Sequence, residues 1–176
     1  MDGMKRRIVT FLAALSTTQA SSRPSLPEQW WTYMASYDDG PGSIRLNLAL
    51  RRAAPEVKYP NLIVTGTTYT TSRTDALPEK IDAKRLNDLQ ERIVAEIAKH
   101  TPYVYAGTFT HNFEQLHYVY VKIPDGIQHA LSDVYASHCP GCKVYTNIKQ
   151  DPSWYDYSDF LFPNEATREH YGLQLD

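Results

Sequence analysis

The chain has 176 residues, and its 18 lysine and arginine residues against 20 aspartate and glutamate residues give a formal net charge of −2. This balance argues against a nucleic-acid-binding protein, which presents a basic face or stripe to the phosphates. The length suits a single domain that is large enough to bury a hydrophobic core.

The first twenty residues have the three-part pattern of a secretory signal peptide. A basic segment at 5–7 precedes an apolar stretch at 8–15, and small residues lead to a cleavage site after Ala20. Eight apolar residues are too few to cross a bilayer, which takes about 20, so we expect a periplasmic or secreted protein without a membrane span. The predicted organisation is a signal peptide at 1–20, a linker at 21–28 and a single domain at 29–176.

Strand and turn signals alternate at the start of this domain. The aromatic segment 30–37 predicts a strand, and a dense turn signal follows at 38–42. At 43–50, isoleucine and leucine alternate with polar residues, which predicts a half-buried strand and therefore a hairpin. A third strand is expected at 61–70, where β-branched residues are frequent.

Two amphipathic helices are predicted further along the chain. The first begins with Asp82 as its N-cap and with Ile81 stapled onto the first turn, and it ends near His100. Its apolar stripe consists of Leu86, Leu89, Ile93 and Ile97. The second helix begins at a capping box formed by Asp125 and Gln128. Its apolar face consists of Ile127, Leu131 and Val134.

Three more strands complete the pattern. Residues 103–110 and 115–123 form a second hairpin, and 143–149 is the last strand. After the first hairpin the order is therefore β-α-β-β-α-β, the order of ferredoxin-like domains. We expect an α+β sandwich with an antiparallel sheet, both helices on one face, an added N-terminal hairpin and an aromatic C-terminal tail.

That tail carries the most characteristic pattern in the chain. Aromatic and apolar residues crowd 151–163, and we expect this segment to fold back onto the core because so much apolar surface does not stay solvated. The tail resembles a bacterial family of domains of unknown function, family six-nine-five, with similarity over roughly residues 28–163. The residues that carry the resemblance in the tail are Asp151, Pro152, Trp154, Tyr157, Phe160, Leu161 and Pro163.

Upstream features are similar to that family too, namely Trp31 and Tyr33 in the first strand and the Gly40–Pro41 turn. The family is in turn similar to the RraB-type regulators of ribonuclease E activity, which are ferredoxin-like and bind a protein partner. The resemblance therefore implies the fold and a possible protein partner, and it implies no catalytic residue.

Cys139 and Cys142 are the two cysteines of the chain and form a Cys-Pro-Gly-Cys motif. In an oxidising compartment such a pair most simply forms a structural disulfide across a short loop. A redox-active dithiol is the alternative, although the negative end of the preceding helix disfavours a thiolate. A metal site with His138 is the third possibility, but no further ligand pair has suitable spacing, so no metal is predicted.

Other catalytic patterns are missing from the sequence. It contains no G-x-S-x-G, no phosphate-binding glycine loop and no H-E-x-x-H, and we predict no catalytic residue and no cofactor. Tyrosines that share strand faces either form a stacking platform for a ligand or pack beneath the helices and the tail. These tyrosines are Tyr103, Tyr105, Tyr118 and Tyr120.

We therefore expect a non-enzymatic, exported module that acts by binding, with a protein as its possible partner. One alternative is a periplasmic thiol–disulfide redox protein that uses Cys139 and Cys142. The other is a cytosolic protein-binding regulator, which requires that residues 1–20 are no signal peptide.

Overall fold

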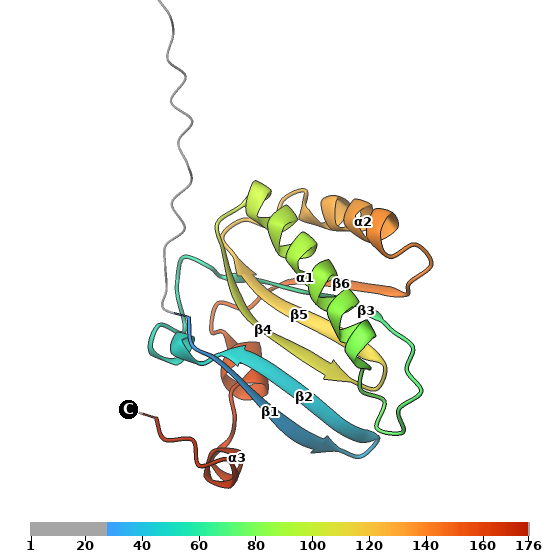
Figure 1. The fold of residues 1–176 in the computed structure, drawn as a ribbon. Coiled ribbons are helices and arrows are strands. Elements are labelled where there is room, and N and C mark those ends of the chain that lie inside the picture. Colours follow the sequence, from blue (N-terminus) through green and yellow to red (C-terminus); the bar gives the residue numbers. More distant parts are fainter. Residues whose placement is uncertain (1–27, 176) are drawn as a thin grey trace, which may run out of the picture.

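A computed structural model describes residues 28–175 (Figure 1), so the predicted signal peptide lies outside the described residues. The strands are β1 (Trp30–Tyr37), β2 (Gly40–Asn47), β3 (Asn61–Thr68), β4 (Tyr103–His111), β5 (Glu114–Val121) and β6 (Val144–Gln150). The helices are α1 (Lys80–His100), α2 (Ile127–His138) and α3 (Glu165–His170). A 3-10 turn, η1 (Leu48–Arg52), and a π-helical turn, η2 (Asp156–Leu161), complete the structure. None of the described helices is long and apolar enough to cross a membrane.

The six strands form one antiparallel sheet in the order β1-β2-β4-β5-β3-β6. The predicted N-terminal hairpin extends this sheet, because β2 pairs with β4. Figure 1 shows α1 and α2 on one face of the sheet and the tail on the other. The predicted α+β class with an antiparallel sheet is confirmed.

One hydrophobic core lies between the sheet and the two long helices. Ile63 from β3 and Val119 from β5 are fully buried there beneath both helices. The predicted apolar stripe of α1 is confirmed, since all four of its residues are buried. The stripe of α2 is confirmed at Ile127 and Leu131, which are buried, while Val134 is partly buried.

The predicted helix starts were wrong in detail. Helix α1 begins at Lys80 after Glu79, so Asp82 lies inside the first turn. There its carboxylate is still stabilised by the positive end of the helix dipole. Ile81 is 64% exposed and forms no staple. Helix α2 has the left-handed Gly126 (φ 74°) as its N-cap, which leaves Asp125 outside the helix.

Strand β2 ends three residues earlier than its alternating pattern predicted. At Asn47 the chain turns into η1, and the Asn47 side chain accepts hydrogen bonds from the backbone N–H groups of Gln29 and Ala49. Leu48 and Leu50 remain buried because they sit in η1 against the tail side of the sheet. Both a strand and a 3-10 turn bury leucine, so the alternating pattern alone does not show where the strand ends and the turn begins.

The tail forms a second hydrophobic core on the opposite face. Trp154 is completely buried, and its ring stacks on Tyr120 of β5 at 4.0 Å between centroids. Its indole N–H donates to the carbonyl of Tyr59 at 3.0 Å. Tyr157 and Leu161 are buried beside it. The prediction that the tail folds back onto the core is confirmed.

A buried carboxylate organises the start of this tail. Asp151 accepts hydrogen bonds from the Tyr120 hydroxyl at 2.7 Å and from the backbone N–H groups of Tyr155 and Asp156 at 2.8 and 3.1 Å. Burial raises the pKa of Asp151, but these hydrogen bonds outweigh it and hold the pKa below its ordinary value. Asp151 therefore caps the turn into η2 and ties the tail to β5.

Candidate functional site

The helix-side face of the sheet changes from apolar to polar along the strands. Two neighbouring rows of directly opposed residues make up the polar end. The first row runs Thr32, Arg45, Thr108, His117 and Thr65 from β1 to β3, and the second runs Met34, Ser43, Thr110, Gln115 and Thr67. Opposed residues in an antiparallel sheet point to the same face, so these side chains form one continuous polar strip.

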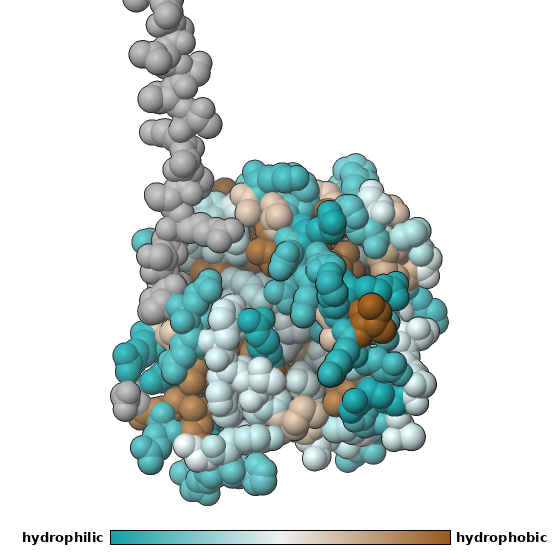
Figure 2. Space-filling model, in the orientation of Figure 1, coloured by the Kyte–Doolittle hydropathy of each residue, from teal (hydrophilic) through white to brown (hydrophobic). Residues whose placement is uncertain are grey.

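The strip lies only partly beneath the helices. The β1–β2 hairpin extends the sheet past α1 and α2 (Figure 1), and Figure 2 shows mostly near-neutral and hydrophilic residues over this region. A cleft of about 650 Å³ forms between the uncovered strands, the N-terminal half of α1 and the loop before it. We call this the polar cleft. Its walls include Arg73, Leu77, Asn87, Gln90 and Glu91. Its floor is the part of the polar strip that lies on β1, β2 and β4, together with Gln115 of β5. Sites for small ligands have this range of volume.

Gln115 is the most informative residue of the polar cleft. Its side chain is 8% exposed, and its amide nitrogen donates to the Thr110 hydroxyl at 3.1 Å. Its Oε1 atom has no hydrogen-bond partner, and within 28–175 it is the one buried side-chain nitrogen or oxygen in that condition. An unpaired buried polar atom costs about 1–3 kcal/mol, which a ligand that donates a hydrogen bond would recover.

The same polar rows are satisfied where α2 covers them. The Thr65 hydroxyl lies 2.9 Å from the Tyr135 hydroxyl and 2.8 Å from that of Thr146. The Thr67 hydroxyl donates to the carbonyl of Lys143 at 2.9 Å. The unpaired oxygen therefore belongs to a residue at the open end of the strip, which lines the cleft.

An aromatic and cationic cluster lies at the other end of the polar cleft. The guanidinium of Arg45 sits 4.3 Å from the centre of the Trp30 ring, and the Trp30 and Tyr105 rings are 5.6 Å apart. In the described part of the chain, no carboxylate forms an ion pair with Arg45. A cation held on an aromatic face and facing a cleft is suited to an anionic group.

His117 lies behind the floor in a buried hydrogen-bonded group. Its Nδ1 is 2.9 Å from the Tyr105 hydroxyl, which in turn lies 2.5 Å from the Thr108 hydroxyl. Burial lowers the pKa of His117 from 6.5 to about 3, so the imidazole is neutral at physiological pH. It positions Tyr105 and Thr108 and adds no charge to the polar cleft.

The four tyrosines considered as a binding platform divide between the two faces. Tyr118 and Tyr120 are buried under the tail, where Tyr118 packs near Phe160. Tyr103 and Tyr105 are half-buried on the helix side. Of the four, Tyr105 lies beside the polar cleft through its contact with Trp30.

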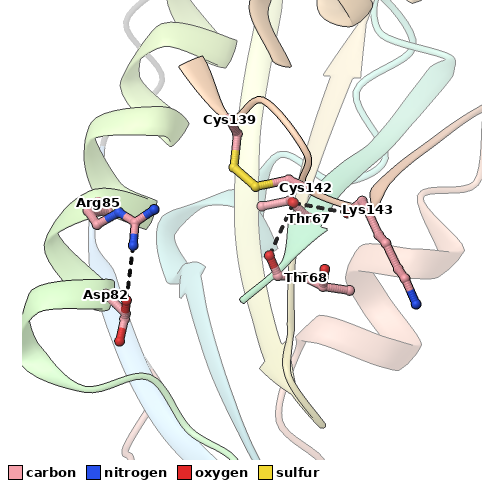
Figure 3. Close-up of a disulfide and its surroundings, with 7 residues drawn as sticks. All are labelled: Thr67, Thr68, Asp82, Arg85, Cys139, Cys142 and Lys143. Carbon is pink, nitrogen blue, oxygen red and sulfur yellow. Dashed lines mark hydrogen bonds and ion pairs between the residues drawn. A yellow bond between two sulfur atoms is a disulfide. The ribbon is translucent and has the colours of Figure 1, made fainter. Parts of the chain in front are cut away.

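The Cys-Pro-Gly-Cys motif lies elsewhere, at the end of α2. Figure 3 shows Cys139 joined to Cys142 beside α1, and their Cα atoms are 5.5 Å apart. The Cys139 backbone N–H donates to the Tyr135 carbonyl, so this residue is the C-cap of α2. The motif lines a second, smaller cavity of about 300 Å³, which also contains the Asp82–Arg85 ion pair.

The histidines and acidic side chains of the described residues are dispersed. Within residues 28–175, no three histidine, cysteine, aspartate or glutamate side chains lie close enough together to hold an ion. His111 instead pairs with Asp39 at 2.7 Å across the β1–β2 and β4–β5 turns. His129 lies on the exposed face of α2.

Comparison with known proteins gives one match. A family model described as a family of unknown function, DUF695, matches residues 28–162. No curated protein and no solved structure matches the chain. The match runs from the start of the described structure through β6 and η2, and so includes both the polar cleft and most of the aromatic tail. The chain therefore belongs to the DUF695 family of unknown function.

Proposed function

We propose that this protein is an exported, non-enzymatic binding module that takes its ligand in the polar cleft. The observation that carries the proposal is Gln115, which lines a cleft of about 650 Å³ and whose buried Oε1 atom has no hydrogen-bond partner. A fold that keeps an unsatisfied group at an open site sacrifices stability there, which is typical of functional sites.

The chemistry of the cleft supports binding over turnover. Its floor offers hydroxyl, amide and guanidinium groups, which orient a ligand through hydrogen bonds. The imidazole of His117 has a lowered pKa and its Nδ1 is engaged by Tyr105, so it is poorly placed to exchange protons with a ligand.

The substitution Gln115→Met tests this proposal. Methionine has a similar length and removes both the unpaired oxygen and the hydrogen bond that the amide donates to Thr110. The gain from the first offsets the loss of the second, so the free energy of unfolding is expected to stay level within about 1 kcal/mol. In the wild-type protein, a casein hydrolysate or a maltodextrin mixture is expected to shift NMR signals of cleft residues, and Gln115→Met is expected to abolish that response. Urea denaturation and ¹⁵N-correlated spectra supply the two measurements.

Gln128→Met is the matched control, because Gln128 is an exposed residue of α2 outside the cleft. It should leave the ligand response intact. The proposal is wrong if neither mixture shifts cleft signals in the wild type. It is equally contradicted if Gln115→Met lowers the free energy of unfolding by more than about 1 kcal/mol, since the amide would then be a structural group.

The disulfide is proposed to be structural. It closes the turn between α2 and β6, and the next residue, Lys143, receives hydrogen bonds on its carbonyl from Thr67 and Thr68 of β3. Cys139 sits at the C-terminus of α2, where the helix dipole raises the cost of a thiolate and so disfavours the alternative redox role.

Export and the disulfide give one joint prediction. Protein purified without reductant from the cells that make it is expected to begin at Ser21 and to be two hydrogens lighter than its dithiol form. Intact mass spectrometry before and after reduction checks both points. A reduced chain that retains residues 1–20 contradicts both and favours the cytosolic regulator.

The finer fold assignment also belongs to this proposal. The unit from β3 to β6 has the chain order of a ferredoxin-like domain, and its strands lie in the sheet order β4-β5-β3-β6. We propose that this unit is ferredoxin-like and that β1–β2 is an addition that builds the cleft. A relation to RraB-type regulators stays a prediction.

A further inference from the structure

We propose that the polar cleft recognises the carboxyl-terminal end of an extended peptide. Arg45 binds the terminal carboxylate, and Gln115 Oε1 accepts a hydrogen bond from a backbone N–H further back in the peptide. The assignment rests on the proposed binding function and names the ligand class of the same site.

The charges of the cleft favour an anion at the Arg45 end. Arg73 is already neutralised by a two-point contact with Asp75, and Glu91 lies on the exposed surface of α1 at the rim. The floor therefore carries one positive charge, that of Arg45, without a carboxylate partner among the described residues. A planar guanidinium binds a carboxylate with two parallel hydrogen bonds.

The donor and acceptor pattern favours a peptide over a simple carboxylate. Gln115 Oε1 is an acceptor that needs a donor from the ligand, whereas a bare carboxylate offers none. A peptide supplies an N–H at every residue except proline. The hydroxyls of Ser43 and Thr108 and the amide of Gln90 are further partners for its backbone.

The spacing of these groups sets the length of the ligand. Arg45 and Gln115 lie two strands apart and in neighbouring rows of the sheet. With about 4.8 Å between strands and about 3.4 Å between residues, their Cα atoms are roughly 12 Å apart. An extended peptide advances about 3.4 Å per residue, so a tripeptide end bridges the two positions.

The direction of the peptide follows from Trp30. The Arg45 guanidinium lies over the Trp30 ring, on the side of its row away from Gln115. The carboxylate thus lies at the Trp30 end, and the chain runs back across β4 toward Gln115 on β5.

The test compares N-acetyl-tri-alanine with its C-terminal amide and with maltotriose, each titrated into the ¹⁵N-labelled protein. The acetylated acid is expected to shift the Gln115 side-chain amide and the Trp30 indole signals. The amide form is expected to bind at least about tenfold more weakly, because a hydrogen bond between charged groups is lost. Arg45→Gln should reduce binding of the acid to the level of the amide.

Arg92→Gln is the charge-matched control, since Arg92 is exposed on α1 outside the cleft. It should leave the affinity for the acid unchanged. Equal affinity for acid and amide overturns the carboxylate assignment. A response to maltotriose alone overturns the peptide assignment but leaves the proposed binding function intact. If casein hydrolysate and maltodextrin also fail to shift the cleft signals, the binding function itself is overturned.

Discussion

Trp154→Ala is expected to lower the free energy of unfolding by about 3–5 kcal/mol. The indole is completely buried between the sheet and η2 and stacks on Tyr120 at 4.0 Å between centroids. Its removal leaves a cavity that the antiparallel sheet on one side cannot fill by moving. It also leaves the carbonyl of Tyr59 without the hydrogen bond that it accepts from the indole N–H at 3.0 Å.

The backbone at Trp154 shows how favourable the packing of the indole is. Its φ of 56° lies in the left-handed region, which a residue other than glycine adopts at a cost. In the wild type the packing of the indole outweighs that cost. Alanine keeps the same backbone conformation, so the expected loss comes from the packing and the hydrogen bond of the indole.

Equilibrium urea denaturation followed by far-ultraviolet circular dichroism measures this loss. Tyr155→Ala is the matched control in the same turn, because its side chain is 62% exposed and its hydrogen bond to Asp151 comes from the backbone. We expect that variant to change stability by no more than about 0.5 kcal/mol. A loss below 1 kcal/mol in Trp154→Ala would mean that the tail is not anchored through this ring.

Acidification is expected to destabilise the protein through His117. Burial lowers the pKa of this histidine to about 3 in the folded protein, against about 6.5 in the unfolded chain. Below pH 6.5 the unfolded state therefore binds a proton that the folded state does not bind. Stability is complete above pH 6.5 and falls by about 1.4 kcal/mol per pH unit, to a total loss of about 5 kcal/mol near pH 3.

His117→Gln is expected to flatten this profile, because glutamine does not titrate and its amide still reaches the Tyr105 hydroxyl. The relevant window is pH 6.5 to 4.5, above the range in which Asp39, Asp75 and Asp151 take up protons, since each has a lowered pKa. His129→Gln is the control, because that side chain is 88% exposed. Equal slopes in the wild type and His117→Gln would show that His117 is protonated in the folded state.

The secondary structure was largely predictable because its signals are local. The apolar residues of α1 recur every three or four positions, and those of β2 alternate. The spacing in each segment therefore indicates which face of the element is buried. Element ends were less predictable. Strand β2 stops where the Asn47 side chain captures two backbone N–H groups, and α2 starts where Gly126 turns left-handed.

The candidate site was missed, although a signal for it exists. Thr108 and Thr110 in β4, and Gln115 and His117 in β5, sit at alternate positions that point to the helix side of the sheet. Polar residues on the face that should be covered by helices indicate either a satisfied internal network or an open site. Their register against β2 decides between the two, and register between distant strands is not written in local periodicity.

Composition, the segment periodicities and the aromatic tail were thus set by the chain itself, because burying apolar surface is a local demand on each segment. The polar cleft was decided by tertiary structure. It exists because β2 pairs with β4 across some sixty residues of sequence, which places Arg45 opposite Thr108 and beside the row that holds Gln115. Pairing between distant strands brings these side chains together, and no local sequence pattern shows that they are neighbours.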